Sequence, residues 1–235
     1  MGNHLTLTSA DGFELDAYRA DPPADVATLG AVVVIQEIFG VNSHIRSVVD
    51  RYSANGYVAI APALFDRVER GVELTYEAPD VEIGRGIARG GKLDNDQSLL
   101  DVRAAAAAVS GAAGGDGKVG VVGFCWGGLL VARSAIESAD VFSAGVAYYG
   151  GGAPALADQH PTVPMMMHFG EHDTAIPLAD VEVLRAAWPH VTFHIYDAHH
   201  GFNCDARASY DPAAANLAQE RTFAFLAEHL LQKNP

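Results

Sequence analysis

Residues 119–128 restrict the possible fold more than any other part of the sequence. A β-branched run leads directly into Gly123-Phe124-Cys125-Trp126-Gly127-Gly128. A strand that turns sharply into a helix forces the residue at its tip toward positive φ and needs small residues two positions away on either side. The pattern therefore predicts a strand, a tight turn with Cys125 at its tip, and a helix over about residues 126–137 whose first amides face the sulfur. The alternative is a buried, unreactive thiol, because free cysteine is among the most buried residue types.

Strands and helices alternate along the rest of the chain. We predict strands at 4–8, 13–19, 31–35, 57–61, 118–122, 142–148, 163–169 and 191–196, helices at 43–54, 94–109, 126–137, 178–188 and 212–231, and an irregular stretch at 62–91. Asp11-Gly12 between the first two strands indicates a hairpin. The later strands are mostly continuous apolar runs, which is typical of a parallel sheet covered on both faces. The sequence therefore predicts one α/β domain over residues 1–235, with a mostly parallel, doubly covered sheet and an antiparallel N-terminal hairpin.

Composition and charge argue against several kinds of binding partner for this protein. The 235 residues carry a formal net charge of −14, which argues against a nucleic-acid-binding protein because phosphates need a basic surface. No apolar run approaches the roughly 20 residues that span a bilayer, and we find no secretory signal. Two cysteines, Cys125 and Cys204, make neither a disulfide framework nor a zinc set. We therefore expect a cytoplasmic protein without a membrane partner, and nothing in the sequence demands more than a monomer.

An acid and a base that could serve Cys125 lie downstream, each directly after a predicted strand. Asp173 follows one strand and His200 follows the next. Because the carboxyl ends of parallel strands meet at one edge of a sheet, nucleophile, acid and base could assemble there. The alternatives are His199 as the base and Glu171 or Asp197 as the acid. No ligand spacing typical of a metal site is present, so we expect neither a metal nor another cofactor.

The segment after the strand at 31–35 supplies further candidates. Gln36-Glu37-Ile38-Phe39-Gly40 lies where a backbone amide complements the amide that follows the nucleophile. The N–H groups of Ile38 and Trp126 are therefore the predicted oxyanion-binding pair. Glu37 ends a wholly apolar strand, where a carboxylate is costly without a partner. Position alone leaves open whether Glu37 is a structural ion-pair member or an active-site carboxylate.

Five motifs spread over nearly the whole chain point to one family. They are Gln-Glu-Ile-Phe-Gly-Val-Asn at 36–42, Gly-Tyr-Val-Ala-Ile-Ala-Pro at 56–62, Gly-Lys-Val-Gly-Val-Val-Gly-Phe-Cys-Trp-Gly-Gly at 117–128, Tyr-Tyr-Gly at 148–150 and His-Gly-Phe at 200–202. Together they resemble the dienelactone hydrolase (carboxymethylenebutenolidase) family. The resemblance implies an α/β-hydrolase fold and a cofactor-free enzyme of aromatic degradation that opens the lactone ring of dienelactone-like (4-carboxymethylenebut-2-en-4-olide) substrates.

The resemblance also implies roles for individual residues. Cys125 would be the nucleophile, His200 its base and Asp173 the residue that orients the base. Glu37 would contact the thiol and shift when substrate binds, so that the cysteine is activated only with substrate present.

Arginine side chains are the predicted clamp for a substrate carboxylate. Family members that use dienelactone hold its carboxylate with two arginines, one before the alanine-rich helix and one shortly after the histidine. Arg85 and Arg89 are the candidates upstream. Arg207 is the candidate downstream, because the position four after the histidine holds Cys204. Phe39 completes the predicted substrate contacts.

Two other functions and one regulatory feature remain open. A broader carboxylesterase or thioesterase would use the same three residues, and a ligand-binding protein would keep the pocket without turnover. Cys204 could lie close enough to Cys125 for a regulatory disulfide, although sequence alone does not give the required Cβ separation.

Overall fold

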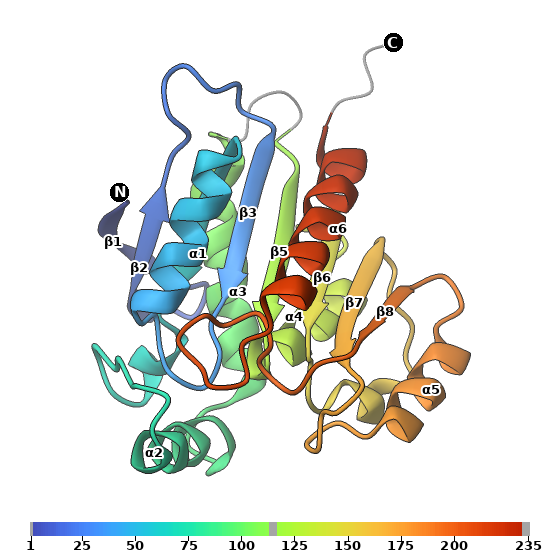
Figure 1. Ribbon diagram of the computed structural model, residues 1–235. Helices are drawn as coiled ribbons and strands as arrows, with labels where there is room; N and C mark the ends of the chain where they lie inside the picture. The colour runs from blue at the N-terminus through green and yellow to red at the C-terminus, as the bar shows by residue number, and fades with distance from the viewer. Residues whose placement is uncertain (1, 113–116, 232–235) are drawn as a thin grey trace.

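One eight-stranded sheet runs through the computed structural model, which describes residues 2–112 and 117–231 (Figure 1). The strands are β1 (Asn3–Thr8), β2 (Glu14–Ala20), β3 (Gly30–Ile35), β4 (Tyr57–Pro62), β5 (Val119–Phe124), β6 (Ala144–Tyr148), β7 (Met165–Gly170) and β8 (Thr192–Tyr196). Their order across the sheet is β1-β2-β4-β3-β5-β6-β7-β8. β2 is antiparallel to both β1 and β4, and all other neighbours are parallel. The predicted mostly parallel sheet with an antiparallel hairpin is confirmed.

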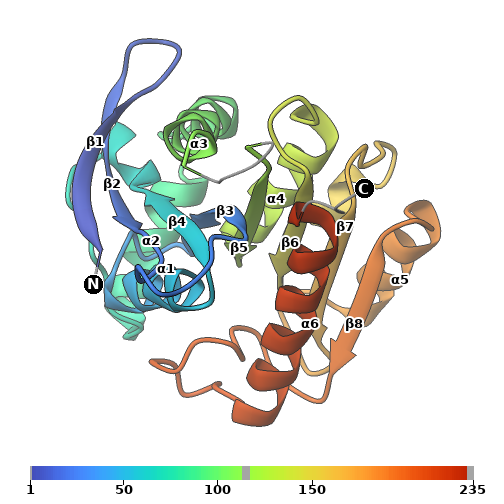
Figure 2. The same ribbon diagram turned by 90° about the horizontal axis from the view of Figure 1, so that it is seen from above.

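Helices cover both faces of this sheet. The helices that lie beside the sheet are α1 (Ser43–Ala54), α3 (Asn95–Ser110), α4 (Trp126–Glu137), α5 (Leu178–Ala187) and α6 (Pro212–Leu230). α1 and α6 lie on one face, and α3 and α4 lie on the other (Figure 2). Every residue of β3, β4, β5, β6 and β7 is buried as a result, which explains why these strands are almost continuously apolar. No helix within the described residues is long and apolar enough to cross a membrane.

The prediction of an irregular stretch at 62–91 is wrong. The stretch contains a short 3-10 helix, η1 (Leu64–Arg67), and a three-turn helix, α2 (Ala78–Arg89). Gly84 and Gly86 each lower helix propensity by about 1 kcal/mol relative to alanine, so the local sequence does not announce this helix. α2 lies beyond the carboxyl ends of the parallel strands (Figure 1), and tertiary packing decides its conformation.

The remaining differences are smaller. β5 continues two residues past the predicted end at 122, β6 and β7 each begin two residues later than predicted, and a 3-10 helix, η2 (Ala153–Leu156), lies between the strands predicted at 142–148 and 163–169. Such shifts are normal where an element ends by fraying rather than at a strong capping signal.

The loops after β3 and β5 meet where the strand order reverses. From β3 the chain continues to β4 on one side, and it later returns to β5 on the other side. The chain therefore leaves these two neighbouring strands in opposite directions, and a crevice remains between the loops at the carboxyl edge of the sheet, which is where open α/β sheets bind ligands. The loops after β7 and β8 reach the same edge, because these strands run parallel to β5.

Candidate active site

Cys125 occupies the sharp turn between β5 and α4. Its backbone has φ 53° and ψ −115°, a region that costs a non-glycine residue about 1–3 kcal/mol. The turn also presses backbones together. A Cβ on Gly123 would lie 2.3 Å from the carbonyl oxygen of Gly127, and a Cβ on Gly127 would lie 2.5 Å from that of Gln36. Only glycine is accommodated at either position without a backbone shift, so the strand, turn and helix have the geometry that the sequence predicts.

Cys125, His200 and Asp173 form one hydrogen-bonded chain. Nε2 of His200 lies 3.2 Å from Sγ of Cys125, and Nδ1 of the same ring lies 2.7 Å from Oδ2 of Asp173. An ionised carboxylate can only accept, so Nδ1 carries a proton and the ring orientation is fixed. Oδ1 of Asp173 accepts from the backbone N–H groups of Ala175 and Ile176, at 2.8 and 3.1 Å. Three hydrogen bonds therefore hold this carboxylate in place.

The imidazole of His200 binds a proton more strongly than usual. Burial alone would lower its pKa, but the hydrogen bonds to Asp173 and Cys125 and the charges of these two groups outweigh burial and raise the pKa to about 10. The surroundings thus favour an imidazolium beside the Cys125 sulfur at neutral pH. Because the thiolate is the nucleophilic form of cysteine, this arrangement can attack a carbonyl carbon.

The three alternative residues lie outside this chain. Nδ1 of His199 contacts the carbonyl oxygen of His172 at 3.1 Å, and Asp197 pairs with Nε2 of His172 at 2.5 Å. Glu171 is exposed. The geometry therefore supports none of the three as a partner of the thiol.

Ile38 and Trp126 line the same cavity as Cys125. Trp126 is the first residue of α4, and the N–H groups of a first helical turn have no acceptor within the helix. Ile38 lies in the loop after β3, and its carbonyl oxygen faces α2 so closely that a Cβ on Gly84 would lie 2.0 Å from it. The unpredicted helix α2 therefore holds the segment that carries Ile38.

A cavity of about 540 Å³ opens beside the thiol. Predicted residues in its wall are Ile38, Phe39, Arg85, Arg89, Cys125, Trp126, His200 and Arg207. Residues that were not predicted include Val81, Ala88, Leu93, Leu129 and Ile176. Several of these come from α2 and the residues just after it, so recognising α2 from the proline in its first turn would have revealed them. A wall that combines apolar side chains with a few cationic groups is suited to a small organic anion.

The two arginines of α2 lie in open surroundings. The side chain of Arg85 is 57% exposed and pairs with Glu82, one turn earlier, at 2.7 Å. Arg89 is exposed one turn further along the helix, and its guanidinium approaches the backbone of Gly151 across the cavity. Arg89 is therefore placed better than Arg85 to contact a molecule inside.

Arg207 and Glu37 form a partly buried ion pair. Nη1 of Arg207 donates to Oε1 of Glu37 at 3.1 Å, and the guanidinium also lies 5.8 Å from the ring centre of Phe39. The only hydrogen bond of the Cys125 sulfur among the described residues runs to His200. Among the described residues Glu37 therefore makes no hydrogen bond to the thiol in this conformation, in which the arginine holds the carboxylate instead.

Cys204 lies close to this ion pair but does not join Cys125. Both cysteines are free thiols, so the disulfide considered above is not formed. Cys204 is fully buried, and burial together with the charge of Glu37 raises its pKa to about 12. Cys204 therefore remains a neutral thiol near pH 7.

Comparison with known proteins gives one consistent result. The dienelactone hydrolase family matches residues 15–230. Proteins from Synechocystis sp. and Salmonella typhimurium, both named "Putative carboxymethylenebutenolidase", are 37% and 33% identical to this chain over 92% and 96% of its length and 93% and 87% of theirs. A crystal structure from Klebsiella pneumoniae, described as a "Putative Dienelactone Hydrolase", superposes with a TM-score of 0.82 at 29% identity and covers 97% of this chain and 99% of its own. The eight-stranded sheet is thus an α/β-hydrolase fold. The chain belongs to the dienelactone hydrolase family and is a carboxylic-ester hydrolase.

Proposed function

We propose that the protein opens a carboxylate-bearing lactone of the dienelactone type, with Cys125 as nucleophile, His200 as base and Asp173 as the residue that orients the base. The observation that carries this proposal is the hydrogen-bonded chain from thiol to imidazole to carboxylate beside a cavity of about 540 Å³. The same order of groups generates a nucleophile in hydrolases of unrelated folds. Strained backbone at the cysteine also supports a functional role, because such strain is concentrated at active sites.

The reaction follows from where the protons lie. The thiolate of Cys125 attacks the lactone carbonyl carbon, and the N–H groups of Ile38 and Trp126 stabilise the charge on the carbonyl oxygen. The ring C–O bond breaks, and the enolate oxygen takes a proton from the His200 imidazolium while a thioester remains on the sulfur. His200 then removes a proton from water, the hydroxide attacks the thioester, and Cys125 leaves as the thiolate. Each proton that His200 gives is returned in the second half of the cycle.

Arg207 supports a substrate with its own carboxylate. The guanidinium lies in the cavity wall, and its present partner there is the carboxylate of Glu37. A substrate carboxylate offers the same charge-assisted hydrogen bonds and can take over one or both. Glu37 would then be a buried carboxylate without its cation, and the free-energy cost of this state favours a movement of its side chain. The family resemblance suggests that it moves toward the thiol, so that substrate binding itself activates Cys125.

A kinetic comparison of substrates tests the role of this carboxylate. Dienelactone, its methyl ester and a neutral lactone share the reacting ring but differ in the group that Arg207 or Arg89 would bind. We expect kcat/KM to fall by at least tenfold when the carboxylate is removed, since a hydrogen bond between charged groups contributes about 1.5–3 kcal/mol. Arg89→Met should narrow the difference between dienelactone and its ester, and Arg85→Met serves as the control because Arg85 already pairs with Glu82. Equal kcat/KM for all three substrates would instead favour a broad carboxylesterase or thioesterase that uses the same groups.

Alkylation separates an enzyme from a binding protein. Iodoacetamide should label Cys125 and abolish hydrolysis of p-nitrophenyl acetate, while Cys204 stays unlabelled because it is buried and neutral. Cys125→Ser should lose most of the activity. A protein that is neither labelled nor active would support ligand binding without turnover, and a serine variant as fast as the parent would overturn the proposed nucleophile.

A further inference from the structure

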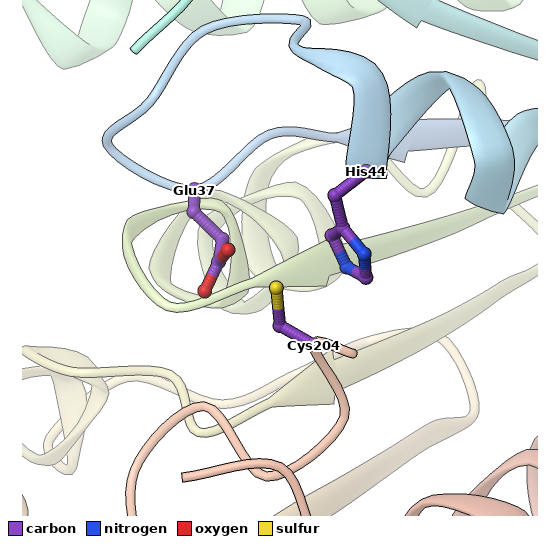
Figure 3. Close-up of side chains that lie close together, drawn as sticks. All are labelled: Glu37, His44 and Cys204. Atoms are coloured by element: carbon purple, nitrogen blue, oxygen red, sulfur yellow. The ribbon is translucent and has the colours of Figure 1, made fainter. Parts of the chain in front are cut away.

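Three side chains that can bind a metal lie close together (Figure 3). Glu37 follows β3, His44 lies in the first turn of α1, and Cys204 lies in the loop after β8. One ligand atom from each lies within 4.8 Å of the others. The exposed fractions of the residues are 1%, 4% and 0%, respectively. Figure 3 shows the carboxylate and the imidazole pointing toward the sulfur from different elements.

Two polar atoms of this cluster have no hydrogen-bond partner among the described residues. They are Oε2 of Glu37 and Nε2 of His44. The hydroxyl of Tyr149 is a third such atom, and its pKa is raised by burial and then by the charges of Glu37 and Cys204. Native proteins rarely leave buried acceptors unpaired, so each such atom calls for a ligand, a water or an ion. Here two of them belong to side chains of one compact cluster.

His44 is oriented as metal-binding histidines are. Its Nδ1 lies 2.9 Å from Oδ1 of Asp205. Because the carboxylate accepts this hydrogen bond, Nδ1 holds the proton and Nε2 presents a lone pair. A carboxylate behind the imidazole is the usual outer partner of a histidine that ligates zinc. The side chain of Asp205 is 55% exposed, so solvent lies just behind this imidazole.

We propose that Glu37, His44 and Cys204 bind a zinc ion. Carboxylate oxygen, imidazole nitrogen and thiolate sulfur are all zinc ligands, and a fourth position remains for water. On binding, the thiol of Cys204 gives its proton to solvent and no group is oxidised. The formal charges of the zinc ion and Arg207 then balance those of Glu37, Asp205 and the thiolate. Tetrahedral zinc keeps its ligand atoms roughly 3.5 Å apart, so a pair separated by the full 4.8 Å would have to approach by about 1.3 Å and a closer pair by less.

Zinc bound here would also affect turnover. An ion on Oε2 of Glu37 holds this carboxylate near Arg207 and prevents the movement toward the thiol. Zinc would then be a reversible inhibitor, a consequence that rests on the proposed function. Binding itself does not depend on that function, and it can be measured without substrate.

Cobalt provides a direct probe of the thiolate ligand. The parent protein, first freed of metal with EDTA, is alkylated at Cys125 with iodoacetamide, which leaves Cys204 as its remaining thiol because the chain has two cysteines. Titration with Co²⁺ should give one equivalent of binding, with the sulfur-to-cobalt charge-transfer band and the intense visible bands of a four-coordinate site. Addition of Zn²⁺ should abolish both. The variant Cys125→Ser provides the same test without alkylation.

Variants then identify the ligands. Adding Cys204→Ser should remove the charge-transfer band, His44→Gln should remove or greatly weaken binding, and Asp205→Asn should weaken it 10–100-fold. His199→Gln is the matched control, because His199 is an exposed histidine outside the cluster and should leave affinity unchanged. The proposal is overturned if the parent protein binds no Zn²⁺ in calorimetry, which would assign the open atoms to a buried water. It is equally overturned if the Cys204→Ser protein keeps the charge-transfer band.

Discussion

Replacing Gly84 by alanine tests whether α2 positions the segment around Ile38 that we propose binds the oxyanion. Gly84 lies inside α2 with ordinary helical backbone, so alanine should raise helix propensity by about 1 kcal/mol. Its Cβ, however, would lie 2.0 Å from the carbonyl oxygen of Ile38. That oxygen belongs to the backbone, and no flexible side chain can turn aside. α2 and the Ile38 segment must therefore separate by about 1–1.5 Å to regain normal contact.

A displacement of this size should weaken catalysis much more than it weakens the fold. Loss of one oxyanion donor lowers kcat by about 10²–10³-fold, and a misplacement of about 1 Å can cost about 10²-fold. We therefore expect Gly84→Ala to lower kcat with p-nitrophenyl acetate by about 10²-fold. Circular dichroism and urea unfolding would show that the variant remains folded.

The same helix contains the matched control. A Cβ on Gly86 would have no atom within 4 Å, so Gly86→Ala gains helix propensity without a clash. It should keep the parent kcat and be up to about 1 kcal/mol more stable to urea. If Gly84→Ala is as active as Gly86→Ala, then either Ile38 does not donate to the oxyanion or α2 does not position it.

Two further predictions concern charged groups. Asp173→Asn removes a hydrogen bond and a charge that raise the pKa of His200, so the alkaline limb of the activity profile should move to lower pH. The raised pKa of His200 also stabilises the folded parent, fully below about pH 6.5 and no longer above about pH 10. The difference in unfolding free energy between parent and variant should therefore shrink as the pH rises from about 6.5 to about 10. A difference that stays constant over this pH range would contradict the prediction. Arg67→Met should cost about 3–5 kcal/mol in urea unfolding, because it leaves Asp101, which is fully buried and 2.7 Å from Nε of Arg67, without its cation. Arg103→Met, which breaks an ion pair with an exposed aspartate, should cost at most about 1 kcal/mol. Equal losses of stability in the two variants would refute the idea that burial makes the Arg67–Asp101 pair the more important one.

The sheet and the three residues of the hydrogen-bonded chain could be predicted because both leave local signals. Strands buried on two faces are almost continuously apolar, and parallel strands bring their carboxyl ends to one edge. Cys125 and Asp173 each come after such a strand and His200 comes after the less buried parallel strand β8, so their proximity follows from the alternation of strands and helices. The glycines around Cys125 added the backbone geometry of the turn.

Features that depend on distant contacts could not be predicted in the same way. Arg207 and Glu37 are 170 positions apart, and no local pattern tells which of several arginines reaches a buried carboxylate. The approach of Glu37, His44 and Cys204 has the same origin, because their spacing matches no metal motif. α2 was missed for a different reason: its glycines oppose a helix locally, while close packing against Ile38 requires one of them.

The reacting groups and the cavity wall are carried by different parts of the fold, and this separation has a consequence for changing the substrate of this enzyme. The thiol and its two partners are carried by segments that follow the parallel strands β5, β7 and β8, whereas much of the cavity wall comes from α2 and the residues after it, and α2 itself has few contacts with the sheet. Rigid elements hold reacting groups, and peripheral segments tolerate exchange. Selection for new substrates should therefore accumulate changes between η1 and α3 and spare the strand ends, so that acceptance of a new ester and the ability to cleave it can evolve almost independently.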